Sequence, residues 1–236
     1  MSTTYILMWL EAPLQSWGYD SKFDRRDTLK FPTKSGILGL LCCALGAGGE
    51  QRELLSIFST LSQTVFSFIR LKGEREPMLS DFHMVGSSYN EKDPWENLHI
   101  PKTVKGKKAN KGGTKITYRN YLQDAAFAVL LEVPVAMSIN LAAALQNPVW
   151  DLYLGRKNCA PTDFIYRGIF SSESEARTYA MEIAIEKSLK LEFQVLNGEH
   201  KGDVMILNDV PLQFGEHKKY RDRRVTIVYF HDSTFS

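Results

Sequence analysis

Cysteine and clustered histidine are scarce in this chain of 236 residues. Cys42 and Cys43 are adjacent and Cys159 is distant, so neither a Cys-x-x-Cys spacing nor a histidine cluster supplies four ligands to a metal ion. We therefore expect a reduced, intracellular protein that uses no metal and no other cofactor.

The sequence also has no segment long enough to cross a membrane as a helix. The uncharged stretch at residues 35–49 contains five glycines and is shorter than the roughly 20 apolar residues that a spanning helix needs. The N-terminus has neither the positive start nor the small-residue cleavage site of a signal peptide. These absences predict a cytoplasmic protein without membrane contact.

A strong excess of one charge is missing as well. The formal net charge is only +2, so overall charge does not predict nucleic-acid binding, and any such case must rest on local clusters. Hydrophobic residues make up 44% of the chain, which is typical of a folded protein and not of a disordered one. The length allows one large domain or two unequal ones.

Hydrophobic periodicity and turn residues predict alternating strands and helices. We expect helices over residues 37–45, 51–61, 138–146 and 173–187, with Thr33 or Ser35 capping the first. Strands are predicted over 5–10, 64–71, 78–85, 116–122, 125–133, 190–195, 204–207 and 225–230. The strands at 64–71 and 78–85 should form a hairpin, and residues 14–31 and 151–163 should be loops.

One local cluster of positive charge lies in a stretch without a hydrophobic pattern. Residues 97–123 contain seven basic residues and no acidic one, and residues 86–115 show almost no hydrophobic periodicity. Lysines on a flexible arm suit a polyanion, because each neutralised phosphate releases condensed counterions. A solvated loop explains the same composition equally well.

Two other segments combine basic and aromatic residues. Residues 218–224 place five cations around Tyr220, and the first loop contains Trp17, Tyr19, Arg25 and Arg26. Such mixtures suit unpaired bases and phosphates. Alternatively, 218–224 is an exposed turn before the last strand, and Asp24 and Asp27 simply pair with the arginines.

The segment Thr33-Lys34-Ser35-Gly36 enters the first predicted helix. Free amides, two hydroxyls and a lysine could together bind one phosphate, or the same residues could only cap the helix. The order of residues is not that of a Walker loop, so nucleotide hydrolysis has little support. His83 is the best candidate for a general base, although a lone histidine is weak evidence.

Five strings of the sequence occur in a familiar order: APLQSWG at 12–18, FPTKSGILGLL at 31–41, DFH at 81–83, RNYLQDA at 119–125 and YLGRKNC at 153–159. Together they resemble the CasD family of Cascade subunits from type I-E CRISPR systems, within the RAMP superfamily. The resemblance covers roughly the first 170 residues.

This resemblance implies an α+β fold with a ferredoxin-like, RNA-recognition-type (RAMP) domain. That domain would comprise residues 1–85 and 116–170, with a basic β-hairpin thumb inserted at 86–115 and a small C-terminal β region at 171–236. The implied function is not catalytic: the protein would hold the 5′ handle of the CRISPR RNA and cap the filament of Cascade backbone subunits. Further partners would be the large subunit that reads the protospacer-adjacent motif and, through the complex, target DNA.

The residues implied to bind RNA come from several segments. Thr33, Lys34, Ser35 and Gly36 would hold a handle phosphate. The surface for splayed bases would consist of Gln15, Trp17, Arg25, Arg26, His83, Arg119 and Tyr121, with Tyr153, Gly155, Arg156 and Lys157 on its other side. Further contacts are assigned to Lys105, Lys107, Lys108, Arg223 and Arg224.

Two alternatives of different classes remain. The first is a metal-independent endoribonuclease that processes precursor CRISPR RNA, as type I-C relatives do, with His83 and either Lys34 or Tyr19 as candidate catalytic residues. The second is a pure protein-interaction subunit whose basic arm meets an acidic partner.

Overall fold

The computed structural model describes residues 2–19, 24–85, 92–95, 102–107 and 115–230. Its elements in chain order are β1 Thr3–Gln15, β2 Arg25–Arg26, α1 Lys34–Leu45, α2 Arg52–Phe58, β3 Gln63–Arg70, β4 Leu79–Val85, β5 Lys115–Pro134, α4 Val135–Gln146, β6 Tyr166–Phe170, α5 Glu173–Glu186, β7 Leu189–Asn197, β8 Asp203–Gln213 and β9 Lys219–Tyr229.

The strands form one sheet in the order β6-β1-β5-β3-β7-β9-β8, and β2 and β4 pair with the outer part of β5. Apart from the short parallel pairing of β2 with β5, the paired strands are antiparallel. The molecule is therefore a mixed protein of helices and a mostly antiparallel sheet, as the predicted class requires. Strands β7, β8 and β9 continue this sheet, and the division into three parts stays a prediction.

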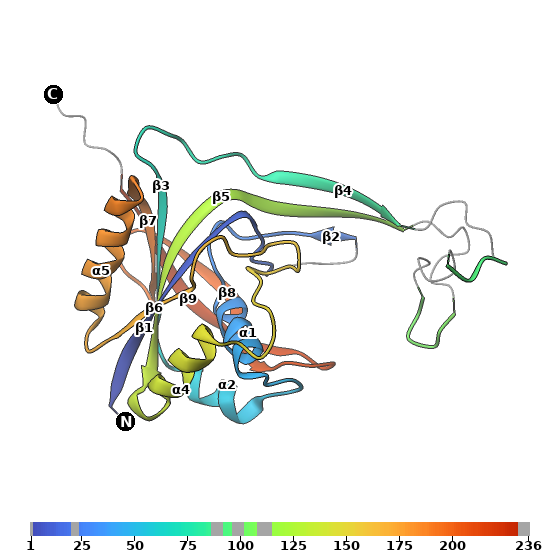
Figure 1. Ribbon diagram of the computed structural model, residues 1–236, viewed down its shortest axis with the longest axis horizontal. Coiled ribbons are helices and arrows are strands. Elements are labelled where there is room, and N and C mark those ends of the chain that lie inside the picture. Colours follow the sequence, from blue (N-terminus) through green and yellow to red (C-terminus); the bar gives the residue numbers. More distant parts are fainter. Residues whose placement is uncertain (1, 20–23, 86–91, 96–101, 108–114, 231–236) are drawn as a thin grey trace.

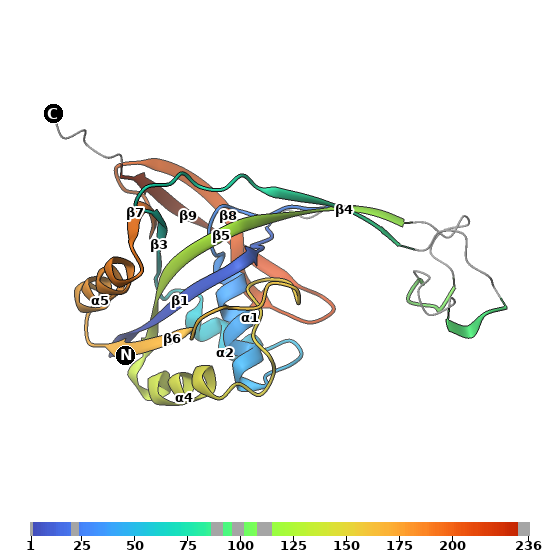
Figure 2. The same ribbon diagram turned by 45° about the horizontal axis from the view of Figure 1, so that its top comes forward.

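The sheet is covered on both faces, which explains the apolar run at the start of the chain. Ile6, Met8 and Leu10 pack in the core on the side of α1, α2 and α4, whereas Leu7 and Trp9 face the smaller core under α5. Because successive side chains of a strand point to opposite faces, a strand buried on both sides must be apolar throughout. Figures 1 and 2 show α5 on one side of the sheet and the other helices opposite it.

Strand β5 belongs to both the body and a projecting arm. Its second half lies between β1 and β3, and its first half leaves the body and pairs with β4 from Leu79↔Tyr121 to Val85↔Lys115. Figure 1 shows β4 and β5 running out together from the body. We call the paired part of β4 and β5, together with β2, the arm base.

This topology contradicts two of the strand predictions. Strand β3 pairs with β5 and β7 and does not form a hairpin with β4, which pairs with β5. The predicted strands 116–122 and 125–133 are one continuous strand, with Asp124 between them at a φ of 44°. A turn-like residue in the left-handed region bends this strand without ending it, because β1 pairs with residues on both sides of it.

The remaining helices and strands lie close to their predicted positions, and two strands were missed: the two-residue β2, within the predicted loop 14–31, and β6. Helices α1, α4 and α5 and strands β7, β8 and β9 overlap their predicted ranges, although β8 and β9 are several residues longer. Strand β6 has only five residues and includes Gly168, so it is too short and irregular to show the alternation of a strand. In the described part of the chain, no helix is long and apolar enough to span a membrane.

Candidate functional site

Most of the predicted site residues lie around the arm base, where the first loop and the loop at 151–163 meet the arm. Strand β2 lies beside β5, with Arg25 opposite Tyr118 and Arg26 opposite Arg119. The amide of Ser16, at the end of β1, donates a hydrogen bond to the Leu154 carbonyl at 3.0 Å. The first loop, the loop at 151–163 and the arm therefore meet at one place.

Gly155 allows the close approach of these loops. Its φ is +105°, and a Cβ atom built on it would lie 1.7 Å from the Ser16 carbonyl oxygen. No other residue type fits this backbone contact without displacing the chain. Gly155 thus has a structural role at this junction besides its predicted role in an RNA surface.

Arg156 joins the loop at 151–163 to the arm base. Its guanidinium lies 4.5 Å from the centre of the Tyr121 ring, and it donates hydrogen bonds to the carbonyl oxygens of Asn120 at 3.2 Å and Arg26 at 2.7 Å. These contacts use two of the five N–H donors of Arg156 and place its guanidinium against the Tyr121 ring. Its main effect is to hold β2, β5 and the loop in a fixed arrangement.

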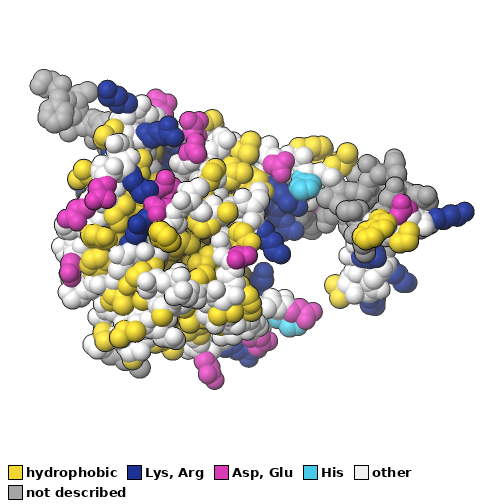
Figure 3. All heavy atoms as spheres, viewed as in Figure 1, with side chains coloured by type: hydrophobic (Ala, Val, Ile, Leu, Met, Phe, Trp, Pro, Cys, Tyr) yellow, Lys and Arg dark blue, Asp and Glu magenta, His cyan; other side chains and the backbone are white. Residues whose placement is uncertain are grey.

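Exposed cations surround this junction. Arg25, Arg26 and Lys157 are exposed, and Arg119 and Tyr153 are partly exposed. Figure 3 shows Lys and Arg side chains gathered where the arm leaves the body, at the edge of a hollow beneath the arm. A single strand of nucleic acid would find positive charge there that is not buried in the fold.

Acidic side chains at the arm base partly offset this charge. The Asp27 carboxylate accepts a hydrogen bond from the Asn120 amide at 2.8 Å, and Asp81 lies 3.8 Å from Nδ1 of His83. His83 is partly exposed and pairs with Thr117 across the arm. His83 therefore lies on the same surface as Arg119, as the sequence suggested, but its nearest ionic partner is a carboxylate.

The start of α1 is arranged differently from the predicted phosphate site. The Thr33 hydroxyl accepts from the Gly36 amide and caps the helix, and Ser35 lies beside it. The Lys34 side chain is only 2% exposed and its ammonium donates to the Leu61 carbonyl at 2.6 Å. Burial, with a smaller effect from Arg223, lowers the pKa of Lys34 to about 8.

A carboxylate already occupies the anion position at this helix start. The Lys34 amide donates to the Asp209 carboxylate at 2.8 Å, and Arg223 binds the same carboxylate through two hydrogen bonds of 2.7 and 2.9 Å. Asp209 is 1% exposed. Thr33, Lys34 and Arg223 consequently stabilise the fold, and the expected phosphate contact of this segment has no open position.

Three further predicted residues are buried in the core. Gln15, Trp17 and Tyr121 have at most 2% of their surface exposed. Gln15 donates to the Leu10 and Ala125 carbonyls, and the Trp17 indole donates to Gln15. A Cβ atom on Gly36 would lie 2.8 Å from Trp17, so that glycine accommodates the indole. These residues support the surface from beneath and do not present rings to a base.

The other predicted residues lie away from the junction or outside the described chain. Arg224 is exposed on β9 and pairs with Glu199. Residues 218–224 are thus mostly strand, and the expected turn lies before them. Lys105 and Lys107 are exposed in the segment 102–107, whereas Lys108 and most of the predicted thumb at 86–115 lie outside the described residues.

Sequence reasoning missed two residues of the arm base, Phe82 and Tyr118. Both are exposed aromatic residues and their ring centres lie 5.5 Å apart. Their positions in the sequence could have marked them as site residues, since Phe82 belongs to the DFH string and Tyr118 precedes Arg119. Their contact depends on the pairing of β4 with β5, which the predicted hairpin of β3 and β4 concealed.

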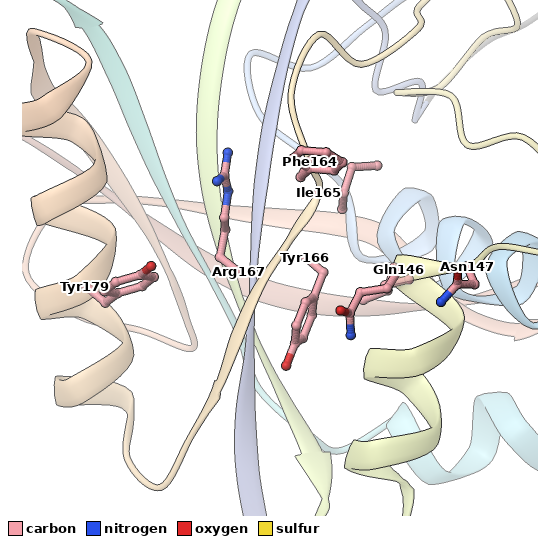
Figure 4. A pocket seen from close by; sticks show the side chains of 8 residues that line it. Gln146, Asn147, Phe164, Ile165, Tyr166, Arg167 and Tyr179 are labelled. Carbon is pink, nitrogen blue, oxygen red and sulfur yellow. The ribbon is translucent and has the colours of Figure 1, made fainter.

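A separate cavity of about 520 Å³ lies beside β6, at one edge of the sheet. It is lined by Leu145, Gln146, Asn147, Phe164, Ile165, Tyr166, Arg167 and Tyr179, none of which was predicted as a site residue. Figure 4 shows Gln146 and Asn147 at the end of α4 and Tyr179 on α5, with β6 between them. Arg167 is paired with Asp163, so this cavity offers no free cation. Among the described residues, no group of three or more His, Cys, Asp or Glu side chains could hold a metal ion.

Comparisons with known proteins agree with the resemblance seen in the sequence. A family model described as CRISPR-associated protein (Cas_Cas5) matches residues 5–226. The CRISPR system Cascade subunit CasD of Escherichia coli (strain K12) is 33% identical over 175 residues, which is 70% of each chain.

Two solved structures share the fold over nearly the whole chain. A chain of a CRISPR RNA-guided surveillance complex superposes with a TM-score of 0.69 and 28% identity, over 95% of this chain and 89% of that one. A structure titled as a crystal structure of a Cas protein gives a TM-score of 0.58 and 27% identity, over 95% and 94% of the two chains.

Proposed function

This chain belongs to the CRISPR-associated Cas5 family, and from that premise we propose that it is a non-catalytic subunit of a type I-E Cascade complex that holds the 5′ handle of the CRISPR RNA. In this proposal it also caps the filament of backbone subunits and contacts the large subunit that reads the protospacer-adjacent motif. Its partners are thus the CRISPR RNA, these two subunits and, through the complex, target DNA.

We also propose a more specific fold than the mixed architecture of helices and sheet described above. We assign the strands around β1, β5 and β3 to a ferredoxin-like RAMP domain, and β4 with the outer part of β5 to the start of its thumb. The arm is a two-stranded projection beside exposed cations. That combination is the observation that carries the proposal, since it offers one strand of RNA a charged surface outside the core.

Because several of the predicted residues are buried, fewer side chains are left that could contact RNA. Arg25, Arg26, Arg119 and Lys157 are the cations at the arm base with exposed or partly exposed side chains, and Lys105 and Lys107 are exposed beyond it. We propose that these contact phosphates. Arg156, Trp17 and Tyr121 act indirectly, by fixing the loops that carry the contacts, and Lys34 stabilises the fold at the start of α1.

Salt dependence tests the phosphate contacts. The complex is purified by a tag on a neighbouring subunit encoded in the same operon, and affinity for guide RNA is measured across a range of potassium chloride concentrations. Each lost phosphate contact should lower the slope of log affinity against log salt by about 0.7 for a single strand. Arg26→Ala should show that loss, whereas Lys201→Ala should not, because Lys201 lies in the turn between β7 and β8, away from the arm.

Cleavage is tested with the chain purified on its own. The purified chain is incubated with precursor CRISPR RNA in the presence of a chelator, and we expect the RNA to remain intact. Defined cleavage that disappears in His83→Ala would replace the scaffold with an endoribonuclease. Complexes that contain the subunit but no guide RNA would instead favour a pure protein-interaction role.

A further inference from the structure

The arm base has an apolar face that the proposed function leaves unexplained. Phe82, Met84, Ile116 and Tyr118 lie on the same side of β4 and β5, because Phe82 pairs with Tyr118 and Met84 with Ile116. We call these four residues the aromatic face. Phe82 and Tyr118 are 55% and 45% exposed, although aromatic rings of this size usually contribute to a core.

A cation is part of this face. Arg25 lies opposite Tyr118 on β2, and its guanidinium carbon is 5.9 Å from the centre of the Tyr118 ring. The rings of Phe82 and Tyr118 meet edge to face at an interplanar angle of 63°. Phe82 and Arg25 together fix the plane of Tyr118, and Phe82, the more exposed ring, offers the larger free surface.

The charge on this face decides what kind of ligand fits it. An apolar protein surface that covered the face would also remove the Arg25 guanidinium from water without a partner, which is costly. A nucleotide brings both a planar base for the rings and a phosphate for the guanidinium. Arg26, the next residue of β2, pairs with Arg119 and so belongs to the opposite face of the arm base, which leaves Arg25 as the cation of β2 on the aromatic face.

We propose that Phe82 and Tyr118 stack an unpaired base of the bound RNA, while Arg25 binds a phosphate of the same nucleotide. This inference rests on the proposed function, since it names the site at which the arm grips a single strand. It assigns ligand contacts to Phe82 and Tyr118, to which the sequence analysis had given no role, and it separates base contact from the cation surface around Arg119.

Equilibrium binding of the full-length chain to synthetic RNA tests this site. The probes are a fluorescent oligoadenylate of about ten nucleotides, within the span of single-strand sites, and a strand of equal length without bases. Phe82→Leu keeps apolar bulk but removes the ring. Phe82→Tyr keeps the ring, and Met84→Leu is a matched control because Met84 is 52% exposed on the same face and has no ring.

We expect Phe82→Leu to weaken oligoadenylate binding about tenfold, within the range found when a stacking ring is removed. Phe82→Tyr and Met84→Leu should bind like the wild type, and none of the variants should differ on the strand without bases. All four residues of the face are on the surface, so equal thermal melting of the variants checks that the fold is kept.

The other outcomes distinguish failure of the stacking site from failure of the proposed function. If the wild type binds oligoadenylate and Phe82→Leu binds it equally well, the stacking site is wrong and the face belongs to another contact. Equal weakening on both strands would also overturn stacking, because no base is then involved. If neither the wild-type chain nor its assembled complex binds RNA, the proposed function fails and this inference fails with it.

Discussion

Replacing Gly155 by alanine tests whether the loop at 151–163 is locked to the end of β1. The new Cβ atom would lie 1.7 Å from the Ser16 carbonyl oxygen and 2.7 Å from the Ser16 carbonyl carbon, and both are backbone atoms that cannot rotate away. The loop must therefore move, and the hydrogen bond between the Ser16 amide and the Leu154 carbonyl is stretched or lost.

The magnitude follows from three contributions. A left-handed conformation costs alanine about 1 to 2 kcal/mol, the lost hydrogen bond costs about 1 kcal/mol, and displacement of the loop adds to both. We expect a total of about 3 kcal/mol, which for a chain of this length lowers the melting temperature by about 6 to 12 °C. Binding of guide RNA should weaken as well, because Arg156 moves with the loop.

Gly49→Ala is the matched control. Gly49 also has a positive φ, +82°, but no atom lies within 4 Å of its Cβ position. That variant should lose only the conformational contribution of about 1 to 2 kcal/mol. Thermal and denaturant unfolding of both variants gives the difference, and equal losses at Gly155 and Gly49 would refute the close approach.

Two further predictions concern the start of α1. Asp209→Asn removes the charge that pairs with Arg223, so the free energy of unfolding, measured with denaturant, should fall by about 3 kcal/mol. The control is Asp222→Asn on the exposed side of the same hairpin, which should lower it by no more than about 0.5 kcal/mol. Similar losses in the two variants would show that the Asp209 pair is not buried. The pKa of Lys34 is lowered from 10.5 to about 8 in the folded state, so between these pH values the unfolded chain binds more protons than the folded one. The free energy of unfolding should therefore rise with pH across that window. The rise should be about 3 kcal/mol larger in the wild type than in Lys34→Met. Parallel stability curves of the two proteins from pH 8 to about 10.5 would contradict the lowered pKa.

The sequence was informative where a segment interacts mainly with itself. The apolar spacing in α1 and α5 predicted those helices, since one helix face packs on the sheet regardless of which strands lie there. Thr33 caps α1 as expected. Strand pairing was less accessible, because β3 and β4 are neighbours in sequence but are both paired with β5, which follows them by many residues.

The candidate site shows the same limit. Charge and aromatic character marked Trp17, Lys34 and Arg223 as surface residues, but the structure buries Trp17 and Lys34 and leaves only 8% of the Arg223 side chain exposed. Composition cannot distinguish a cation that awaits a phosphate from one that is paired with a carboxylate far away in sequence, such as Asp209. Conversely, Arg25, Arg26 and Lys157 are exposed as predicted, since loops and edges seldom find a buried partner.

The position of β1 in the sheet has a consequence for synthesis of the protein. Its partners are β5, which ends at Pro134, and β6, which ends at Phe170. While the ribosome is still translating the first half of the chain, the apolar segment from Ile6 to Leu10 is already outside the exit tunnel with neither neighbour to pair with. Such an uncharged β-forming stretch is prone to aggregate. Rapid synthesis of β5, or protection of this segment until β5 is complete, therefore matters more here than in a protein whose first strand pairs locally.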